Sequence, residues 1–329
     1  MTKIAINGFG RIGRTSARII IDRKLGDLVA INDLTDNKTL AHLLKYDSNY
    51  GTFNHEVGYD DNHLIIDKQK IKSYSERDPA KLPWSEDEID VVLECTGFFT
   101  SAEKAKGHLE AGARRVVISA PAENTPTHVL GVNEEMVGSS EIINNASCTT
   151  NCITPVAAVI HAKFGIAKAM MTTIHSYTGD QNLQDGPHKD LRRARSAAIN
   201  IVPTSTGAAK AATEVIPELK GIFDGLAIRV PTAVGSLSDF TFLLKKKTSV
   251  EEVNEVLSEA AQQPRYKNIM EVTDQPIVSS DIVGNPASAI VDLGLTQVVD
   301  GDLVKVVVWY DNEFGYSNRL VEMAVAIGS

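Results

Sequence analysis

The sequence predicts two domains: a doubly wound α/β domain with a mostly parallel sheet, then an α+β domain with a mixed or antiparallel sheet. Three features support this. Short apolar runs alternate with helical stretches over residues 3–121. A glycine-rich turn joins the first run to the first helix, and after Cys148 long β-type segments replace the alternation.

The first domain is predicted from strands and helices that alternate along the chain. Residues 3–7, KIAIN, are a short run rich in β-branched residues, and residues 11–24 carry apolar side chains at helical spacing. The alternation continues with strand patterns at 27–32, 89–97 and 114–121 and helical patterns at 37–47 and 101–113. Such alternation is typical of a doubly wound sheet.

The second domain is predicted from the pattern that follows Cys148. A helix at about 149–164 precedes β-type segments at 167–177, 225–231, 236–244, 288–299 and 302–311. Further helices are predicted at 249–263, where Ser249 and Glu252 stand at capping-box distance, and at 315–328. Strands joined by so few helices favour a mixed or antiparallel sheet. The boundary near 147–148 puts Cys148 at a domain junction, a favoured place for ligand sites.

Composition and charge narrow the class of protein. Of the 329 residues, 43% are hydrophobic and 23% charged, and the net charge is −9, which is typical of a soluble globular protein. No long basic run points to nucleic acid as a primary partner. No apolar run approaches the ~20 residues of a membrane helix, and no secretion signal precedes the first strand. With three unevenly spaced cysteines, we expect no disulfide framework and a cytoplasmic location.

Residues 7–13, NGFGRIG, carry a dinucleotide-binding signal. Gly8, Gly10 and Gly13 have the G-x-G-x-x-G spacing directly after a strand and at the start of a helix. The first allows a tight turn, the second lets the backbone approach a pyrophosphate, and the third lets helix pack on strand. The helix start also offers free N–H groups to phosphates. Asp33 follows the second strand, where an acid binds ribose hydroxyls, so the sequence predicts a bound dinucleotide.

Cys148 and His175 are the candidate reacting pair. A thiol attacks as the thiolate, and a helix N-terminus and a nearby imidazolium can each lower its pKa. Cys148 stands at the start of a predicted helix, and His175 ends a predicted strand that enters a polar loop, a place where reacting groups collect. The alternative is an inert cysteine and a structural histidine, because sequence alone does not place the two together. Cys95 and Cys152 are expected to be packing residues.

Six motifs spread along nearly the whole chain resemble those of phosphorylating glyceraldehyde-3-phosphate dehydrogenases. They are INGFGRIGR at 6–14, ASCTTNC at 146–152, HSYTGDQ at 175–181, STGAAKA at 205–211, RVPT at 229–232 and WYDNEFGYS at 309–317. The resemblance implies an NAD-binding Rossmann domain at 1–147, a catalytic domain at 148–314, and a C-terminal helix at 315–329 that packs back onto the first domain. It also implies a homotetramer in which the loop at about 177–202 reaches toward a neighbour's cofactor.

The activity implied by the resemblance is a step of glycolysis or gluconeogenesis. D-glyceraldehyde 3-phosphate, inorganic phosphate and NAD become 1,3-bisphosphoglycerate and NADH. Cys148 would form a hemithioacetal and then a thioester, which suits a group that is both a good nucleophile and a good leaving group. His175 would support the thiolate and take the hydroxyl proton. No metal is implied.

The same motifs imply the remaining site residues. The substrate phosphate would be bound by Thr178, Asp180 and Arg229, and the attacking phosphate by Ser147, Thr149, Thr206 and Gly207. Ser147 and Gly207 keep structural interpretations as well, as an N-cap and a turn residue. The cofactor would be held by Gly8, Gly10, Arg11, Ile12, Gly13, Asp33, Thr96, Ser119 and Asn312, the last at the nicotinamide carboxamide. Asp33 and Pro187 favour NAD over NADP.

Some features leave alternatives open. Gly186, Phe314 and the short stretch 120–133, which lacks its customary lysine, depart from the commonest family pattern but remove no reacting group. The basic stretch 188–195 fits a salt-bridged loop or subunit contact as well as a substrate-phosphate role. Erythrose-4-phosphate dehydrogenase, with the same fold, cysteine and histidine, is the nearest alternative function, although the intact second phosphate site favours the glyceraldehyde enzyme. A binding protein without catalysis is disfavoured by the intact reacting pair.

Overall fold

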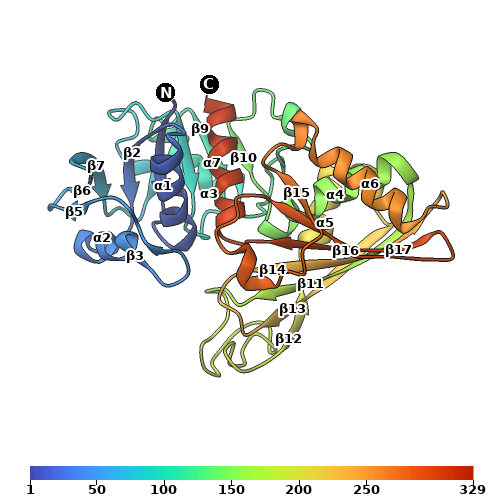
Figure 1. The fold of residues 1–329 in the computed structure, drawn as a ribbon. Helices are drawn as coiled ribbons and strands as arrows, with labels where there is room; N and C mark the ends of the chain where they lie inside the picture. Colours follow the sequence, from blue (N-terminus) through green and yellow to red (C-terminus); the bar gives the residue numbers. More distant parts are fainter. Residues whose placement is uncertain (329) are drawn as a thin grey trace. The chain divides into compact units, whose positions relative to one another are not determined.

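The computed structural model describes residues 1–328, whose contacts divide the chain into two compact units (Figure 1). The first comprises Met1–His128, Asn133–Ala146 and the chain from Ser317 onward. The second comprises Val129–Val132 and Ser147–Tyr316. Residue 329, the last of the expected C-terminal helix, lies outside the described residues.

An eight-stranded sheet forms the centre of the first unit, in the order β10-β9-β8-β1-β2-β7-β6-β5. The strands from β10 to β7 are parallel, and β6 and β5 extend the sheet antiparallel at one edge. Their bounds are β1 Lys3–Asn7, β2 Asp27–Asn32, β5 Val57–Tyr59, β6 His63–Ile66, β7 Gln69–Tyr74, β8 Val91–Glu94, β9 Arg115–Ile118 and β10 Ile142–Asn144. A separate pair consists of β3 Tyr46–Asp47 and β4 Gly51–Thr52.

Three helices connect these strands: α1 Arg11–Arg23, α2 Asn37–Lys45 and α3 Ala102–Glu110. The Asp36 and Ser101 side chains cap α2 and α3 by accepting hydrogen bonds from backbone N–H groups, which satisfies donors that a helix start leaves free. The crossovers from β1 and from β8 run in opposite directions along the sheet. Because such crossovers are right-handed, α1 and α3 cover opposite faces, which confirms the doubly wound class.

The second unit has a mixed seven-stranded sheet in the order β12-β13-β11-β14-β17-β16-β15. The pairs β11/β13 and β15/β16 are parallel and the other pairs antiparallel, which confirms the predicted class. The strands are β11 Ile166–Ser176, β12 Val202–Ser205, β13 Phe223–Val230, β14 Ser236–Leu244, β15 Met270–Thr273, β16 Ala289–Val299 and β17 Leu303–Tyr310. The helices are α4 Cys148–Phe164, α5 Ala208–Val215, α6 Val250–Ala261 and α7 Phe314–Gly328, of which α7 continues into the first unit. Five 3₁₀ turns complete the described residues, at Pro79–Lys81, Glu134–Met136, Pro217–Leu219, Pro264–Tyr266 and Ser279–Ile282.

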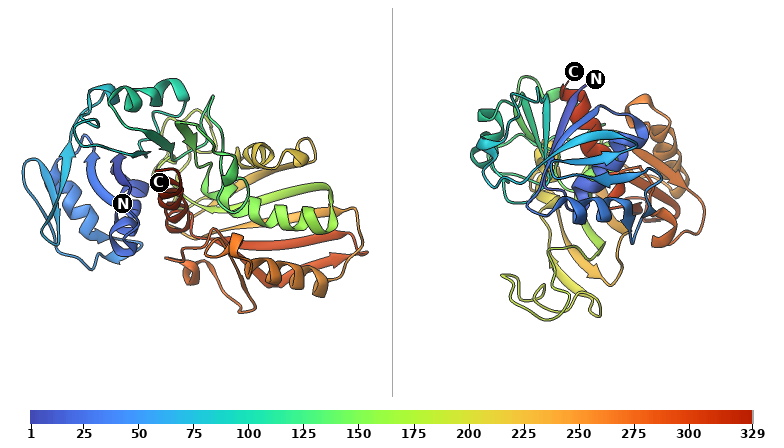
Figure 2. Two further views of the ribbon diagram at one scale, coloured as in Figure 1. Left: turned by 90° about the horizontal axis from the view of Figure 1, so that it is seen from above. Right: turned by 90° about the vertical axis from the view of Figure 1, so that its left-hand side faces the viewer.

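Helices α4, α5 and α6 cover one face of this mixed sheet (Figures 1 and 2). The side chains of β14 alternate accordingly, so that Phe240 and Phe242 are fully buried and their rings stack at 5.0 Å. The opposite face carries exposed apolar side chains, among them Met170, Leu226 and Leu243. Nothing in the described part of the chain covers them.

Candidate active site

The glycine-rich turn of the first unit shows why its three glycines are needed. A Cβ on Gly8, which has φ +91°, would come within 2.6 Å of the Thr96 nitrogen, and a Cβ on Gly13 would overlap the Gly8 carbonyl oxygen. No atom lies within 4 Å of the position of a Cβ on Gly10. Gly8 and Gly13 therefore serve close packing, and Gly10 leaves its backbone open to a ligand.

Arg11 and Ile12 are the first two residues of α1. The helix has no side-chain N-cap, and the amino end of a helix favours a bound anion. The Arg11 guanidinium binds the Asp47 carboxylate at 2.5 Å. Because this ion pair engages the side-chain charge, the role predicted for Arg11 at the cofactor rests on its backbone N–H.

Asp33 is held rigidly after β2. One carboxylate oxygen accepts a hydrogen bond from the Phe9 nitrogen at 2.8 Å and the other accepts one from the Thr35 nitrogen at 2.9 Å. These bonds fix the carboxylate beside the glycine-rich turn, with lone pairs left for ribose hydroxyls.

A hollow of about 500 Å³ opens at the carboxyl ends of β1, β2, β7 and β8. Gly8, Gly10, Asp33 and Thr96 line it, and the exposed Phe98 adds apolar surface. Cofactors of open α/β sheets bind at this end of the strands, so the residues present fit a dinucleotide. Four of the expected cofactor residues in this unit are not part of the lining: Arg11, Ile12, Gly13 and Ser119. The Ser119 N–H donates to the Glu94 carbonyl at 2.9 Å.

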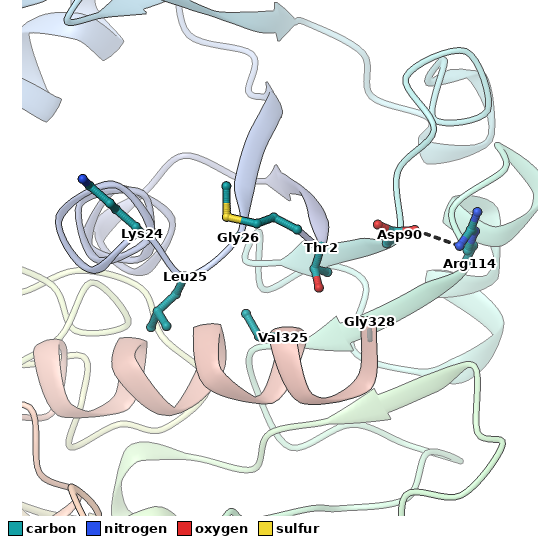
Figure 3. A pocket seen from close by; sticks show the side chains of 9 residues that line it. Thr2, Lys24, Leu25, Gly26, Asp90, Arg114, Val325 and Gly328 are labelled. Carbon is teal, nitrogen blue, oxygen red and sulfur yellow. Dashed lines mark ion pairs between the residues drawn. The ribbon is translucent and has the colours of Figure 1, made fainter.

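A second hollow, of about 540 Å³, lies at the amino ends of β1, β2, β8 and β9 (Figure 3). Thr2, Gly26, Asp90 and Arg114 line it, each directly before a strand, and Asp90 pairs with Arg114 at 3.1 Å. Because this end of an open α/β sheet does not bind cofactors, the hollow is not the dinucleotide site.

In the second unit, Cys148 is the first residue of α4. Ser147 is the N-cap, and its hydroxyl accepts a hydrogen bond from the Thr150 nitrogen at 3.1 Å. The structure thus supports the capping interpretation of Ser147, and the free N–H groups of the first turn lie next to the thiol.

His175 lies beside this thiol, with Nε2 3.4 Å from the Cys148 sulfur. Its Nδ1 lies 2.6 Å from the Ser176 carbonyl oxygen, which only accepts, and 3.0 Å from Arg229 Nη1, which only donates. The shorter contact with the carbonyl favours a proton on Nδ1 of the neutral ring. Nε2 then presents its lone pair to the thiol. The structure brings the predicted pair together in the tautomer that a base requires.

The ionisation of this pair corrects one expectation. We expected the surroundings to lower the pKa of Cys148, but burial raises it, and the charge of Arg229 and the hydrogen bonds of Thr149 only oppose that effect. Burial, followed by the charge of Arg229, lowers the pKa of His175 to about 3. Burial disfavours each charge alone, which favours a neutral thiol beside a neutral imidazole.

Arg229 contacts both His175 and Thr178. Its Nη1 lies 3.0 Å from His175 Nδ1, 3.1 Å from the Ser176 carbonyl oxygen and 3.4 Å from the Thr178 hydroxyl. Its Nε is buried without a hydrogen-bond partner among residues 1–328. A buried donor without a partner costs about 1–3 kcal/mol, which fits an anion as the missing partner.

Asp180, also expected at the substrate phosphate, is instead bound to the Arg193 guanidinium. Burial alone would raise the pKa of this carboxyl, but the hydrogen bond and charge of Arg193 hold it below its usual range. Arg193 also donates to Thr204 at 2.9 Å and to the Ser205 carbonyl at 3.0 Å. Sequence reasoning missed Arg193 as an individual residue, although it lies in the basic stretch 188–195.

The residues expected at the attacking phosphate lie at two helix starts, those of α4 and α5. Thr149 is buried in the first turn of α4, and its hydroxyl lies 3.0 Å from the hydroxyl of Tyr310. Thr206 precedes α5, where its hydroxyl accepts from the Ala208 nitrogen at 3.2 Å, and Gly207 is the N-cap of α5. The starts of α4 and α5 therefore supply both hydroxyls and free N–H groups.

Asn312 is oriented by two hydrogen bonds to its side-chain oxygen. These come from the Gly235 nitrogen at 3.1 Å and the Ser236 hydroxyl at 2.9 Å. With Oδ1 held in this way, Nδ2 is left to donate elsewhere.

Residues 1–328 contain no cluster of three or more His, Cys, Asp or Glu side chains that could hold a metal ion. Within the same range, every helix is too short or too polar to span a membrane.

Comparisons with known proteins identify the family of the chain. The family models "Glyceraldehyde 3-phosphate dehydrogenase, NAD binding domain" and "Glyceraldehyde 3-phosphate dehydrogenase, C-terminal domain" match residues 2–102 and 147–312. Glyceraldehyde-3-phosphate dehydrogenase of Mycobacterium tuberculosis is 56% identical over 99% of this chain and 98% of its own length. The same enzyme of Borreliella burgdorferi is 52% identical over 98% of both chains. The chain therefore belongs to the glyceraldehyde-3-phosphate dehydrogenase family and is an NAD-dependent oxidoreductase.

Proposed function

We propose that the second unit oxidises D-glyceraldehyde 3-phosphate through a covalent intermediate on Cys148 and passes the acyl group to inorganic phosphate. The product is 1,3-bisphosphoglycerate. The observation that carries the mechanism is the Cys148 sulfur at a helix start, 3.4 Å from His175 Nε2.

In the first step the Cys148 sulfur attacks the aldehyde carbon and His175 Nε2 accepts the thiol proton. Because burial disfavours a lone thiolate, proton transfer within the pair accompanies the attack. His175 returns this proton to the resulting oxyanion, which gives the hemithioacetal hydroxyl, and takes it back as the hydride leaves the carbon and the thioester forms. NAD, bound at the first unit, supplies the hydride acceptor.

The thioester then reacts with inorganic phosphate. A thiolate is a good leaving group, so the acyl carbon stays activated until phosphate attacks. We assign the attacking phosphate to Ser147, Thr149, Thr206 and Gly207 at the two helix starts. We assign the substrate phosphate to Thr178 and to the Arg229 guanidinium, with Asp180 acting through Arg193, because a carboxylate repels phosphate while Arg193 attracts it.

The cofactor assignment places NAD on the first unit, residues 1–147. The backbone of Gly8, Gly10, Arg11, Ile12 and Gly13 would receive the pyrophosphate, Asp33 the adenosine ribose, and Thr96 and Ser119 would lie along the cofactor. Asn312 would hold the nicotinamide carboxamide through Nδ2. The domain boundaries 1–147 and 148–314, with a helix at 315–329, remain part of this proposal.

NADH formation tests this function. The protein, NAD and phosphate should turn over D-glyceraldehyde 3-phosphate and depend on phosphate for steady turnover. Erythrose 4-phosphate, tested in parallel, should be used far less well. Faster use of erythrose 4-phosphate would transfer the assignment to the sibling enzyme.

We propose further that the chain assembles as a homotetramer. The open sheet face is apolar, since Met170, Leu226 and Leu243 are exposed there, and Leu191 and Ile199 are exposed on the loop 177–202. Exposed apolar patches of this kind mark protein interfaces. Light scattering at micromolar concentration should give about four times 35.6 kDa, and a mass near one chain would contradict the tetramer.

A cytoplasmic location stays a prediction. Cys95, Cys148 and Cys152 are all free, the state that a reducing compartment maintains. Cell fractionation with antibodies against the chain would test it.

A further inference from the structure

A chain of buried polar side chains crosses the first unit at the carboxyl ends of four neighbouring strands. Glu94, Asn7 and Asn32 are the last residues of β8, β1 and β2, and they stand in register. Asn7 Nδ2 donates to Glu94 Oε2 at 2.6 Å, and Asn32 Nδ2 donates to Asn7 Oδ1 at 2.7 Å. Asn32 also binds both the N–H and the carbonyl of Glu76, each at 2.8 Å, beyond the end of β7. The chain therefore links the ends of β8, β1, β2 and β7.

Glu94 stands at one end of this chain and accepts every hydrogen bond that it makes there. Its Oε1 accepts from the Thr96 nitrogen at 2.8 Å and from the Thr96 hydroxyl at 2.5 Å. Its Oε2 accepts from Asn7 and lies 3.0 Å from His108 Nε2. Trp84 Nε1, which only donates, lies 3.0 Å from His108 Nδ1, so Nδ1 accepts and Nε2 carries the proton. The 3.3 Å contact between His108 Nε2 and Asn7 Nδ2 then joins two donors and is not a hydrogen bond.

Four donors thus converge on a side chain that is 1% exposed. A carboxylate offers about four lone-pair sites and no donor, so it satisfies all of them at once. An amide of the same shape has an N–H in place of one oxygen and cannot do so.

The groups that Glu94 holds form walls of the cofactor hollow of about 500 Å³. Four residues of the network line it: Asn7, Asn32, Glu76 and Thr96. Asp33, which follows Asn32 in the sequence, lines it as well. Glu94 is not one of the lining residues, so it acts on a ligand there only through its neighbours.

We propose that Glu94 is a positioning residue that sets the affinity of this hollow for the adenosine half of the cofactor. It holds Thr96 directly and Glu76 through Asn7 and Asn32. A ligand that meets walls already held in place avoids the entropy cost of ordering them, which raises its affinity. This inference rests on the proposed function, which places the adenosine ribose at Asp33.

Glu94→Gln tests the proposal, because the amide keeps the shape of the carboxylate. In one orientation its N–H faces the Thr96 N–H, and in the other it faces the N–H groups of Asn7 and His108. One wall is released in either case. The Kd of NAD, measured by titration calorimetry, and the KM of NAD should each rise about 10-fold, the effect of one ordinary hydrogen bond. The kcat at saturating NAD should stay within twofold of the wild type. AMP, which carries the adenosine half alone, should lose affinity by the same factor as NAD.

Hydrogen–deuterium exchange of the NAD-free protein follows the walls without ligand or turnover. The Thr96 N–H is held by Glu94 and the Glu76 N–H by Asn32. In Glu94→Gln the peptide that contains Thr96 or the one that contains Glu76 should exchange faster than in the wild type.

Asp90→Asn is the matched control, because it makes the same change just before the other end of β8 (Figure 3). Asp90 accepts from the Lys3 nitrogen at 2.8 Å and pairs with Arg114 at 3.1 Å. Its replacement should leave the affinities for NAD and AMP unchanged, whatever it does to Tm. Asn32→Ala is a second test, since it removes the link to Glu76 and should weaken the binding of both ligands.

The outcomes separate the inference from the function. Unchanged affinities for NAD and AMP in Glu94→Gln would overturn the inference, as would an equal loss in Asp90→Asn, a loss for NAD that AMP does not share, or unchanged exchange of both peptides. If Glu94→Gln does not fold, the same titrations of Asn32→Ala decide, and unchanged affinities there would overturn it. If Asp33→Asn leaves both affinities unchanged, the cofactor assignment of the proposed function fails instead.

Discussion

Replacing His175 with asparagine tests the ionisation state of the reacting pair. His175 is 4% exposed, and burial and the charge of Arg229 lower its pKa to about 3. In the unfolded chain a histidine titrates near 6.5. Between about pH 6.5 and pH 3 the unfolded state therefore binds more protons than the folded state, so the free energy of unfolding rises with pH across this window.

The two pKa values set the size of the effect. At pH 8 neither state is protonated at His175, and its contribution is near zero. At pH 5 protonation stabilises the unfolded state by about 2 kcal/mol and the folded state by almost nothing. Because His175→Asn removes this group, the free energy of unfolding of the variant should fall by about 2 kcal/mol less than that of the wild type between pH 8 and pH 5. Cys148 adds nothing here, since a thiol titrates near 8.5 in the unfolded chain and higher in the folded one.

Urea unfolding followed by circular dichroism at pH 8, 6.5 and 5 measures the difference. His42→Asn, which changes an exposed histidine of α2, should follow the wild type. A thiolate–imidazolium pair at neutral pH would place the folded pKa of His175 above 6.5 and reverse the sign. Either that reversal or an identical pH dependence of His175→Asn and the wild type would refute the neutral pair.

Three further predictions concern the thiols, the ribose acid and the glycines. Cys148→Ser should reduce the initial rate of NADH formation to below about 10% of wild type, whereas Cys152→Ser, at a fully buried position, should keep most activity. A Cys148→Ser rate above about 10% of wild type would exclude the thioester. The wild type should prefer NAD to NADP by at least about 10²-fold in kcat/KM, because a 2′-phosphate ~4 Å from the Asp33 carboxylate is repelled by about 1–4 kcal/mol. Asp33→Asn should reduce this preference. Equal use of both cofactors by the wild type would show that the assignment of Asp33 to the ribose is wrong. Gly13→Ala, whose Cβ would overlap a backbone oxygen, should destabilise the fold by about 1–3 kcal/mol and lower Tm in thermal scans. Gly10→Ala should keep Tm and weaken NAD binding in titrations. The reverse pattern would contradict the roles of the two glycines.

The fold class could be predicted because its signals are local. The pattern of apolar residues identified four of the parallel strands, β1, β2, β8 and β9, and the helices α1, α2 and α3, and the glycine spacing marked the turn after β1. The hairpin of β6 and β7 was missed because its turn is Asp67-Lys68, with both φ angles positive, in place of the Asn-Gly or Asp-Gly pairs that usually signal such turns. Strand β12 was missed because Pro203 interrupts its pattern, which only an edge strand tolerates.

The candidate site was predicted less completely, because its remaining features depend on tertiary contacts. Tyr310 lies 161 residues from Thr149 in the sequence, and no local pattern links the two hydroxyls. Arg193 stood out only as part of a basic stretch. The raised pKa of Cys148 follows from burial by the surrounding elements, and the sequence indicated only the helix start that opposes it.

A rapid-mixing measurement of NADH without phosphate tests the covalent mechanism most directly. The protein is mixed with NAD and D-glyceraldehyde 3-phosphate, and absorbance at the NADH band is followed before and after phosphate is added. If Cys148 keeps the acyl group as a thioester, one NADH per chain forms in a burst, the signal then halts, and phosphate restarts it; Cys148→Ser gives no burst. Steady NADH formation without phosphate, or a full burst from Cys148→Ser, would contradict the thioester on Cys148.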